Sequence, residues 1–580
     1  MKFNEIRKLF LDYMEKNGHK IVPSASLVPD DNSLLFTVAG VVPFKKVLQG
    51  IQDAPAPRVA DSQKCLRAGG KHNDLEDVGF DSRHHTFFEM LGNWSFGDYF
   101  KEGAIELSWN LLTREMNIDP AKLVVTVHDS DDEAAAIWKR ITGKDAIRLD
   151  KPNWWAMGDT GPCGPCTEIF YDHGDDVPGG LPGTPTEDDG RFIEIWNNVF
   201  MQFDRGTDGA LTDLPKQNVD TGGGLERWAA MLQGVHDNYD TDLFVALKNA
   251  TADLVGVQQT AANTPAFKII SDHLRAVGFA IADGIQPSNT ERGYVIRRIL
   301  RRAMRQGQVL GHKGALLSAL YPALVSEMGD AYPELAREQA RVIETIRREE
   351  DAFEDMLTSG LKLLEKEVAG LGGAKTLPGA AAFKLYDTYG FPLDLTEQIL
   401  RERGIGVDLP GFDAAMAEQK ERSRTSQVFK SGLADHSDET TKLHTATHLL
   451  HSALRAVLGD GVAQRGSNIT AERLRFDFSF DRKMTDDEIA LVEAKVNEAI
   501  AAGAEIIMEE MSVADAKAGG AIGLFEAKYG EVVKVYTMGG FSKEICGGPH
   551  AGNTAELGRF KILKEESSAA GVRRIKAVVG

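Results

Sequence analysis

Residues 67–76 read RAGGKHNDLE, residues 83–101 read RHHTFFEMLGNWSFGDYFK, and residues 220–227 read DTGGGLER. Each stretch contains an arginine, and planar guanidinium groups suit bidentate contact with phosphate. The glycines of the third stretch lack the spacing of a dinucleotide-binding loop and do not follow a βαβ pattern. The sequence therefore predicts a nucleotide site in which two arginines on separate elements neutralise the phosphates, acidic side chains hold magnesium, and no protein nucleophile is needed.

The sequence around these stretches predicts strands. Residues 1–243 contain short apolar runs separated by Gly and Pro. Examples are LLFTVAG (34–40), KLVVTVH (122–128) and FIEIWNNVFMQF (192–203). Such runs are typical of a mainly antiparallel sheet, with a few helices beside it. This part of the chain is therefore predicted to be an α+β catalytic domain.

The rest of the chain is predicted to form two further domains. Residues 244–425 have helical periodicity and long charged runs. The Ser-, Asp- and Thr-rich residues 426–442 predict a linker. Residues 443–580 then alternate between helix and strand patterns. The predicted fold class is α+β with several domains.

The composition restricts the class of protein. A chain of 580 residues with 42% hydrophobic residues is expected to be globular and soluble. No run approaches the ~18 apolar residues needed to cross a bilayer, and the acidic residues of segment 1–20 argue against a signal or transit peptide. Four irregularly spaced cysteines predict no disulfide framework and a cytoplasmic location. The net charge of -20 requires that any nucleic-acid site be a local basic patch.

One basic patch lies in residues 292–305, RGYVIRRILRRAMR. Arg297 and Arg301 recur at four-residue spacing, as do Arg298 and Arg302, while apolar residues fill the other side. This pattern predicts a basic amphipathic helix. Two interpretations are open: the helix binds nucleic-acid phosphates, or it pairs with carboxylates of the same chain.

Several stretches resemble motifs of the alanyl-tRNA synthetases. Residues 67–76, followed by residues 83–101, resemble motif 2 of that family, and residues 220–227 resemble its motif 3. Residues 154–168 (WWAMGDTGPCGPCTE) and 194–203 (EIWNNVFMQF) match the same family, and the similarity extends over nearly the whole chain. The resemblance implies a class II synthetase with an antiparallel-sheet catalytic domain, a helical tRNA-recognition domain and a zinc-containing α+β editing domain.

The resemblance also implies which residues hold ATP. Arg67 and Arg227 would clamp its phosphates, and Lys71 would assist formation of the adenylate. Phe88 or its neighbour His85 would pack on the adenine ring. ATP would bring Mg²⁺ with it.

For the amino-acid pocket, the same resemblance implies three side chains. Asp220 would bind the α-ammonium group of L-alanine, and Asn197 would add a hydrogen bond. Trp155 would exclude side chains larger than a methyl group. The expected reaction is activation of alanine by ATP, followed by transfer to tRNA(Ala).

In the helical domain, the resemblance implies recognition of the tRNA acceptor stem. Asn289 and Asp387 would read its G·U pair, because small polar side chains reach base edges in the wide, shallow minor groove of RNA. Arg297 and Arg301 would contact phosphates. The alternative is that Asn289 caps the following helix and Asp387 lies in a turn.

A second site is predicted in the last domain. His444 and His448 (HTATH) lie four apart on a helix-forming run, which places both rings on one face. Cys546 and His550 (CGGPH) follow in a glycine-rich loop that can bend toward one metal ion. These residue types predict zinc, and the editing domain of the family has the same four ligands in the same order.

The resemblance places Thr447 and Gln464 in the editing pocket beside the zinc. Editing has a chemical reason: a pocket for alanine cannot exclude the smaller glycine and discriminates only weakly against serine. Hydrolysis of mischarged Ser- and Gly-tRNA(Ala) would remove the errors.

The chain departs from the family in several respects. Only a short linker stands where a β-barrel subdomain is usual before the HxxxH helix, and a C-terminal assembly domain is not found, so a monomer is expected. Pro549 replaces the usual threonine of the ligand loop. Two alternatives are a tRNA-binding protein that retains the fold without synthesis, and an enzyme that only edits. The presence of Arg67, Asp220 and Arg227 argues against both.

Overall fold

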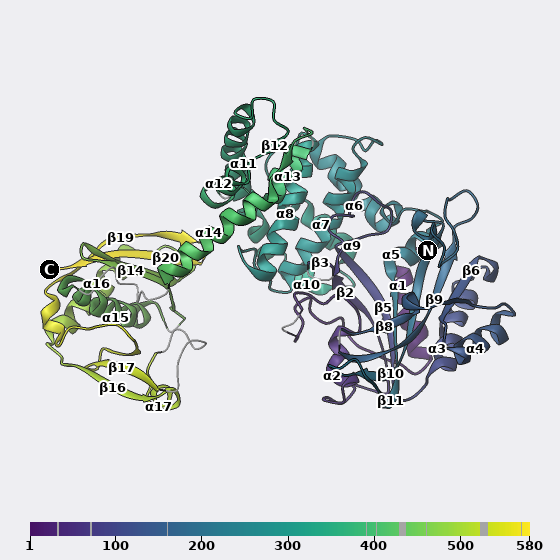
Figure 1. Cartoon of the computed structure of the whole chain (residues 1–580), viewed down its shortest axis with the longest axis horizontal. Helices are drawn as coiled ribbons and strands as arrows, with labels where there is room; N and C mark the ends of the chain where they lie inside the picture. The colour runs from purple at the N-terminus through teal and green to yellow at the C-terminus, as the bar shows by residue number, and fades with distance from the viewer. Residues whose placement is uncertain are drawn as a thin grey trace. The chain divides into compact units, whose positions relative to one another are not determined.

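The structure is a computed structural model of the chain. It describes all residues except 32–33, 70–71, 159, 390, 392, 402, 428–436, 460, 523–531 and 570. Lys71 and most of the predicted linker 426–442 lie outside the described residues. The chain divides into two compact units, Met1–Val407 and Asp408–Gly580, and each is described by itself (Figure 1).

A nine-stranded sheet forms the centre of the first unit. Its order is β1-β2-β5-β11-β10-β9-β6-β7, and β8 pairs with β9. The strands are β1 (Lys20–Ile21), β2 (Arg58–Leu66), β5 (Phe87–Phe96), β6 (Leu123–His128), β7 (Ile147–Leu149), β8 (Trp154–Ala156), β9 (Gly161–Asp172), β10 (Phe192–Arg205) and β11 (Leu211–Gly224). Only the pairs β1/β2 and β6/β7 are parallel, so the sheet is mainly antiparallel, as predicted.

Helices α1 (Phe3–Lys16) and α5 (Leu225–Gln233) pack on one face of this sheet. Phe10 of α1 lies 6.1 Å from Trp196 of β10 and 5.9 Å from Trp228 of α5, measured between ring centroids. Arg7 of α1 forms a buried ion pair with Glu89 of β5. Trp196 and Glu89 therefore lie on the face that these helices cover.

The segment LLFTVAG does not form the predicted strand. Residues 34–40 contain no regular strand in the structure. The backbone N–H of Thr37 donates to Leu27 and its carbonyl accepts from Leu66, so the segment bonds to separate partners and no ladder forms. A Cβ at Gly40 would lie 3.0 Å from the Trp94 ring, and this close approach fixes the path of the segment across the sheet.

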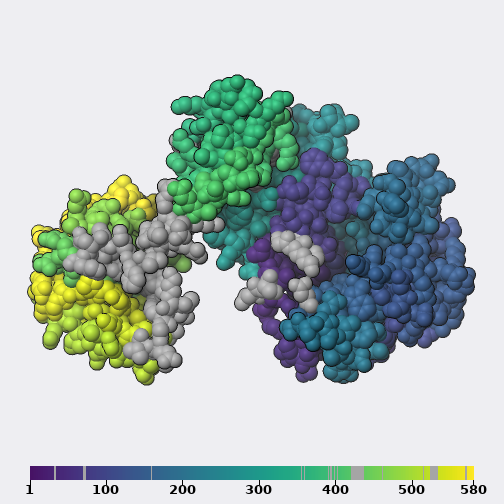
Figure 2. Space-filling model, viewed as in Figure 1, coloured from purple at the N-terminus to yellow at the C-terminus, as the bar shows by residue number. Residues whose placement is uncertain are grey.

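Helices α3 (Lys101–Asn110) and α4 (Asp132–Thr142) lie between strands of the sheet in the sequence. Further helices form most of residues 242–401. They are α6 (Asp242–Val255), α7 (Thr264–Ala282), α8 (Glu291–Val309), α9 (Leu317–Met328), α10 (Pro333–Arg337), α11 (Gln339–Ala369), α12 (Gly379–Tyr389) and α13 (Leu393–Arg401). The predicted basic helix is confirmed as α8, with Ile296, Ile299 and Leu300 fully buried. In Figure 2 the teal and green surface of these helices is continuous with the purple and blue surface of the sheet region.

The second unit is a smaller α+β structure. Helices α15 (Asp438–Leu458) and α16 (Asp486–Ala501) pack on an antiparallel sheet of order β14-β15-β20-β19. The strands of that sheet are β14 (Gln464–Thr470), β15 (Arg473–Ser479), β19 (Phe560–Ala569) and β20 (Val572–Val579). A second sheet contains β16 (Ile506–Ser512), β17 (Val532–Met538) and β18 (Ser542–Ile545), in that order. Helices α14 (Leu409–Gln427) and α17 (Val513–Ala518) complete the unit.

In the described part of the chain, no helix combines the length and the apolar character that crossing a bilayer requires.

Candidate functional site

Strand pairing brings the polar residues of the large sheet to one face. Asn197 on β10 pairs with Glu168 on β9 and with Gly222 on β11. Two residues further along, Val199 pairs with Asp220. Directly paired residues share a face, and so do residues two apart in one strand. Glu168, Asn197 and Asp220 therefore face the same side, opposite the helices.

Asp220 is a buried carboxylate on this face. Its side chain accepts a hydrogen bond of 2.7 Å from the indole N–H of Trp94. Burial raises the pKa of Asp220 to about 7, because water no longer solvates the charged form, and the indole donor only partly compensates. A carboxylate held in this way is well placed to bind a cationic group that enters the site.

A second carboxylate, Asp61, was not singled out from the sequence. Asp61 on β2 pairs with Gly92, and Trp94 lies two residues beyond Gly92 on β5, so Asp61 shares the face of Asp220. It is 1% exposed, and its Oδ1 has no hydrogen-bond partner among the described residues. Burial, followed by the charge of Asp220, raises its pKa. No sequence signal distinguishes this aspartate from one at a turn.

Asn197 and Trp155 both lie beside Val199, the residue paired with Asp220. The amide nitrogen of Asn197 donates to Glu168 at 3.1 Å, and its buried oxygen has no partner in the described part of the chain. Trp155 on β8 pairs with Gly164 of β9 and packs with Cys166 and Val199. An amide oxygen that can accept a hydrogen bond and an indole ring therefore lie close to Asp220 on the sheet.

Arg227, at the start of α5, is held by Glu194 of β10. Its Nη1 donates to the Glu194 carbonyl at 2.7 Å and to the carboxylate at 3.2 Å. A β-bulge between Glu194 and Trp196 allows Glu194 to share a face with Asn197, three residues away. Burial and the neighbouring Glu194 raise the pKa of Glu168 to about 9. Two carboxylates and one arginine therefore meet on this face.

Arg67 and Phe88 lie together at the end of β2 and the start of β5. The guanidinium carbon of Arg67 lies 4.9 Å from the centroid of the Phe88 ring, and its Nε donates to the Val38 carbonyl at 3.0 Å. Burial raises the pKa of Asp74, whereas Arg67 and Arg227 act in the opposite direction. Both arginines are therefore close enough to one carboxyl group to influence its charge.

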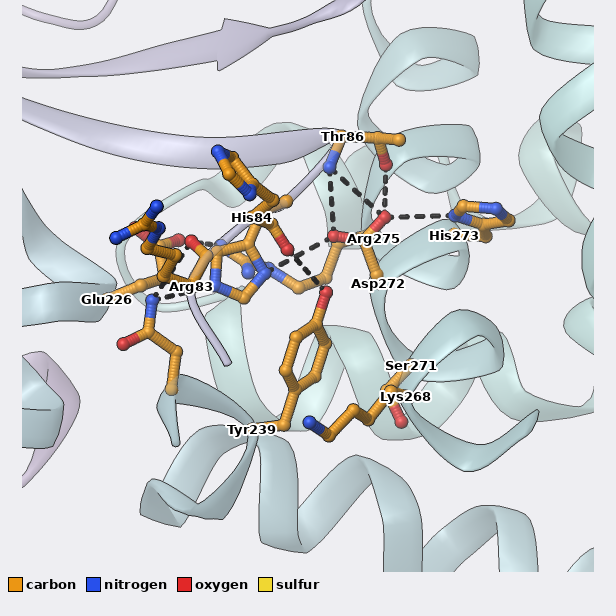
Figure 3. A network of polar contacts seen from close by, with 12 residues as sticks. Arg83, His84, Thr86, Glu226, Tyr239, Lys268, Ser271, Asp272, His273 and Arg275 are labelled. Atoms are coloured by element: carbon orange, nitrogen blue, oxygen red, sulfur yellow. Dashed lines mark hydrogen bonds and ion pairs between the residues drawn. The ribbon is translucent and has the colours of Figure 1, made fainter. Parts of the chain in front are cut away.

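His85 points away from Phe88 into a buried network. It is 4% exposed, its ring stacks on Phe244 at 5.0 Å, and its Nδ1 lies 3.4 Å from Asp272. Asp272 of α7 also accepts hydrogen bonds from the Thr86 N–H at 3.0 Å and from His273 at 2.9 Å (Figure 3). The network joins the start of β5 to α7, so His85 contributes to the support of the site.

A cavity of about 660 Å³ lies beside α8. It is lined by Asn289, Asp387, Arg297 and Arg301, which are far apart in the sequence, and also by Tyr294. The four side chains for which the family resemblance implies tRNA recognition therefore line one cavity; their role stays a prediction. Tyr294 adds an aromatic ring that is 43% exposed.

The contacts of Asn289 and Asp387 differ from the alternative roles considered for them. The cap of α8 is Thr290, and the Asn289 oxygen accepts a hydrogen bond of 2.5 Å from Arg297. Asp387 is an exposed residue inside α12, so it does not lie in the turn that the alternative assumed. Arg297 also binds both carboxylate oxygens of Glu349, at 2.8 and 2.7 Å. The basic helix is therefore partly paired with carboxylates of its own chain.

Four residues of the second unit could hold a metal ion. They are His444 and His448 of α15 with Cys546 and His550 of the loop after β18, and one ligand atom from each lies within 4.8 Å of the others. Burial opposes ionisation of the Cys546 thiol, but hydrogen bonds from the three histidines lower its pKa to about 3. A thiolate with three imidazoles is a donor set suited to tetrahedral zinc. We call these four residues the metal group.

The outer ring nitrogens orient the three histidines. Nδ1 of His444 contacts the Pro549 carbonyl at 2.9 Å, and Nδ1 of His448 contacts Glu544 at 2.6 Å. Nδ1 of His550 lies 3.3 Å from the Thr445 hydroxyl. In each ring the Nε2 atom is therefore left for the metal. Pro549 supplies one of the outer contacts through its carbonyl, which a proline retains.

The two residues that the resemblance places in the editing pocket lie on α15 and on the strand that follows it. Thr447 is on α15 next to His448, is 4% exposed, and donates its hydroxyl proton to the Leu443 carbonyl at 2.8 Å. Gln464 begins β14 and donates to Ser467 at 3.1 Å. No described contact joins these two side chains to each other.

Two family models match the chain. Residues 5–467 match the model described as tRNA synthetases class II (A). Residues 533–576 match the model described as Threonyl and Alanyl tRNA synthetase second additional domain. The first match covers more than half of the chain, which defines it as a class II tRNA synthetase.

Similar proteins show which family of class II synthetases the chain resembles. The chain is 44% identical to an alanine–tRNA ligase of Chelativorans sp. (strain BNC1), covering 100% of this chain and 80% of that protein. It is 45% identical to an alanine–tRNA ligase of Parvibaculum lavamentivorans, with 100% and 79% coverage, and 44% identical to one of Sinorhizobium medicae, with 100% and 80%. The chain belongs to the alanine–tRNA ligase family.

The same alignments are longer than this chain. They extend over 707, 705 and 706 positions, more than its 580 residues. Because the whole chain is aligned, the extra positions belong to the relatives. The missing β-barrel before the HxxxH helix stays a prediction.

Proposed function

We propose that the chain activates L-alanine with ATP and transfers it to tRNA(Ala). The observation that carries this proposal is the arrangement of Asp220, Asn197, Arg67 and Arg227 around one face of an antiparallel sheet. In a member of the alanine–tRNA ligase family, that arrangement supplies an anion for the α-ammonium group and two cations for the phosphates.

The first step is formation of the adenylate. A carboxylate oxygen of alanine attacks the α-phosphorus of ATP, the bond to the bridging oxygen breaks, and pyrophosphate leaves with the electron pair. Arg67 and Arg227 neutralise charge on the phosphates, and adenine packs on Phe88, which lies on the open face, whereas His85 is buried. Asp220 orients alanine through its ammonium group. Catalysis is by positioning and charge stabilisation, without a covalent protein intermediate.

Magnesium would be held by Glu168 and Glu194. Both carboxylates lie on the face that carries Arg227, and burial and the charge of Glu194 raise the pKa of Glu168 to about 9. A hard divalent cation prefers such oxygen ligands and would neutralise charge on the phosphates. The protein side chains would then hold the nucleotide between this pair and Arg227.

In the second step, a ribose hydroxyl of the terminal adenosine of the tRNA attacks the carbonyl carbon of the adenylate, and AMP leaves. The acceptor stem would lie against α8, with Asn289 and Asp387 at the G·U pair and Arg297 and Arg301 at phosphates. The common cavity of these side chains supports this placement. We propose residues 244–425 as the tRNA-recognition domain, after a catalytic domain of residues 1–243.

The metal group would serve hydrolysis of mischarged tRNA. Zinc would be held by His444, His448, Cys546 and His550, where it would shape the pocket for the ester. Thr447 and Gln464 would contact the aminoacyl group. Support comes from the pre-arranged donor atoms and from the match of residues 533–576 to the second additional domain. The proposed editing domain spans residues 443–580.

The test is ATP–pyrophosphate exchange with each of the standard amino acids, followed by transfer to tRNA(Ala). Alanine should support the fastest exchange, and serine and glycine should support weaker exchange because the pocket discriminates poorly between them. Absence of exchange, together with hydrolysis of Ser-tRNA(Ala), would instead favour an enzyme that only edits.

A further inference from the structure

Glu544 is a buried carboxylate beside the metal group but is not one of its four members. It is 2% exposed and lies on β18, two residues before Cys546. Its Oε2 accepts a hydrogen bond of 2.6 Å from His448, and its Oε1 accepts one of 2.9 Å from His451. A single carboxylate therefore joins a metal-group histidine to a histidine outside the group.

His451 has no evident role in holding a metal. It lies three residues after His448 on α15, so both rings share one side of the helix. It is 1% exposed, its ring lies 5.6 Å from Phe476, and its Nε2 has no hydrogen-bond partner in the described part of the chain. Burial of such a polar ring is costly, and the one described hydrogen bond of its ring is to Glu544.

The strand that carries Glu544 also carries the metal-group cysteine. Residues two apart in an extended segment share a side, and the backbone N–H of Cys546 still donates to Lys534 of β17 at 3.0 Å. Tyr536 of β17 is paired with Glu544, and its ring lies 4.2 Å from the His550 ring. One side of this strand pair therefore carries Cys546 of the metal group, Glu544, which binds His448, and Tyr536, which packs on His550.

The hydrogen bond to Glu544 decides which nitrogen of His448 faces the metal group. An ionised carboxylate only accepts, so Nδ1 of His448 must carry the proton. The unprotonated lone pair is then on Nε2, the atom directed toward Cys546. Without Glu544, the ring could exchange tautomers or rotate, and either change would remove one donor atom.

We propose that Glu544 is the positioning residue of the metal group, fixing the tautomer and ring orientation of His448, and that His451 holds the second oxygen of Glu544 in place. This inference rests on the proposed zinc-dependent function. Partners of this kind change metal affinity by about 10- to 100-fold without binding the metal themselves.

The experiment measures zinc affinity of the full chain by competition with a chromophoric chelator. Glu544→Ala and Glu544→Gln should each weaken zinc binding by about 10- to 100-fold, with Gln the milder change because it can still accept one hydrogen bond. His451→Leu should weaken binding less, and His451→Asn should restore part of the loss, since its amide can donate to Glu544.

Glu565→Gln is the matched control. Glu565 is also a buried, paired carboxylate of the second unit, with a side chain 1% exposed, and it binds Arg573 instead of a histidine. Its substitution should leave zinc affinity unchanged while lowering stability. Equal zinc affinity in Glu544→Ala and the parent would overturn the inference, and so would an equal loss in Glu565→Gln.

Cobalt loading separates a positioning residue from a ligand. Cobalt-loaded Glu544→Gln should retain the thiolate-to-cobalt absorption band of the parent, whereas Cys546→Ala should lack it. Loss of the band in Glu544→Gln would overturn the positioning role. If the parent itself binds neither zinc nor cobalt, the proposed metal function fails first, and that outcome differs from an intact parent with unaffected Glu544 variants.

Discussion

The polar residues of the large sheet come from several strands, whereas the metal group comes from one helix and one loop. On the sheet, most side chains already have a protein partner: Arg227 binds Glu194, Asn197 binds Glu168, and Asp220 binds Trp94. In the metal group, four donor atoms lie close together, and the Nδ1 atom of each histidine contacts another group of the protein. The first site must exchange partners when substrate enters, but the second is arranged before its ion arrives.

The largest effect that separates the sheet site from the metal group is expected at Asp220. Asp220→Ala should lower alanine-dependent pyrophosphate exchange by about 10²- to 10³-fold, because it removes one partner of a buried charge pair with the substrate ammonium. Its zinc content should equal that of the parent. Normal exchange by this variant would place the amino-acid site elsewhere.

The reciprocal change is Cys546→Ala. Loss of a ligand should weaken zinc binding by at least about 100-fold, more than loss of an outer partner. Hydrolysis of Ser-tRNA(Ala), faster than that of Ala-tRNA(Ala) in the parent, should fall to the uncatalysed rate, while alanine-dependent exchange stays unchanged. A parallel fall in exchange would show that the two sites do not act separately.

The cavity beside α8 can be tested by changing the tRNA instead of the protein. Replacing the acceptor-stem G·U pair by G·C should reduce charging by about 10- to 100-fold, which corresponds to about 1–3 kcal/mol for one misread pair. Asn289→Ala should charge both tRNAs slowly and with a smaller difference between them. Equal charging of the two tRNAs by the parent would remove Asn289 and Asp387 from recognition.

The smallest expected effect is on pH dependence. Burial raises the pKa of Asp220 to about 7, so the carboxylate is increasingly protonated as the pH falls through 7 and then cannot bind an ammonium ion. The KM for alanine should therefore be about tenfold higher at pH 6 than at pH 8. A KM independent of pH in this range would contradict the assignment.

Periodic patterns predicted the local structure well. The basic helix and the helix with His444 and His448 are confirmed as α8 and α15, because spacing of three to four residues depends only on helix geometry. Runs at 122–128 and 192–203 are confirmed as strands β6 and β10. The run at 34–40 failed because strand formation also needs a partner edge, which periodicity within one segment does not reveal.

The supporting residues could not be predicted from local sequence. Asp61, Glu194 and Glu544 interact with residues on other elements of the structure. The sequence around a carboxylate does not indicate a partner that is distant in the chain. The different positions of His85 and Phe88 likewise depend on distant partners, since His85 precedes β5 and stacks on Phe244, whereas Phe88 lies on β5 next to Arg67. The family resemblance located candidate residues, and strand register determined which of them share a face.

The bulge in β10 couples the candidate site to the packing on the other face of the sheet. Glu194 and Asn197 are three residues apart and share a face only because one extra residue, Ile195, stands between paired positions. The carbonyl of Ile195 accepts a hydrogen bond of 2.6 Å from the indole N–H of Trp228 on α5. Deleting Ile195 would leave Glu194 two residues from Asn197, so the two side chains would still share a face, but the bond to Trp228 would be lost. That variant should therefore lose thermal stability while its KM for ATP changes little.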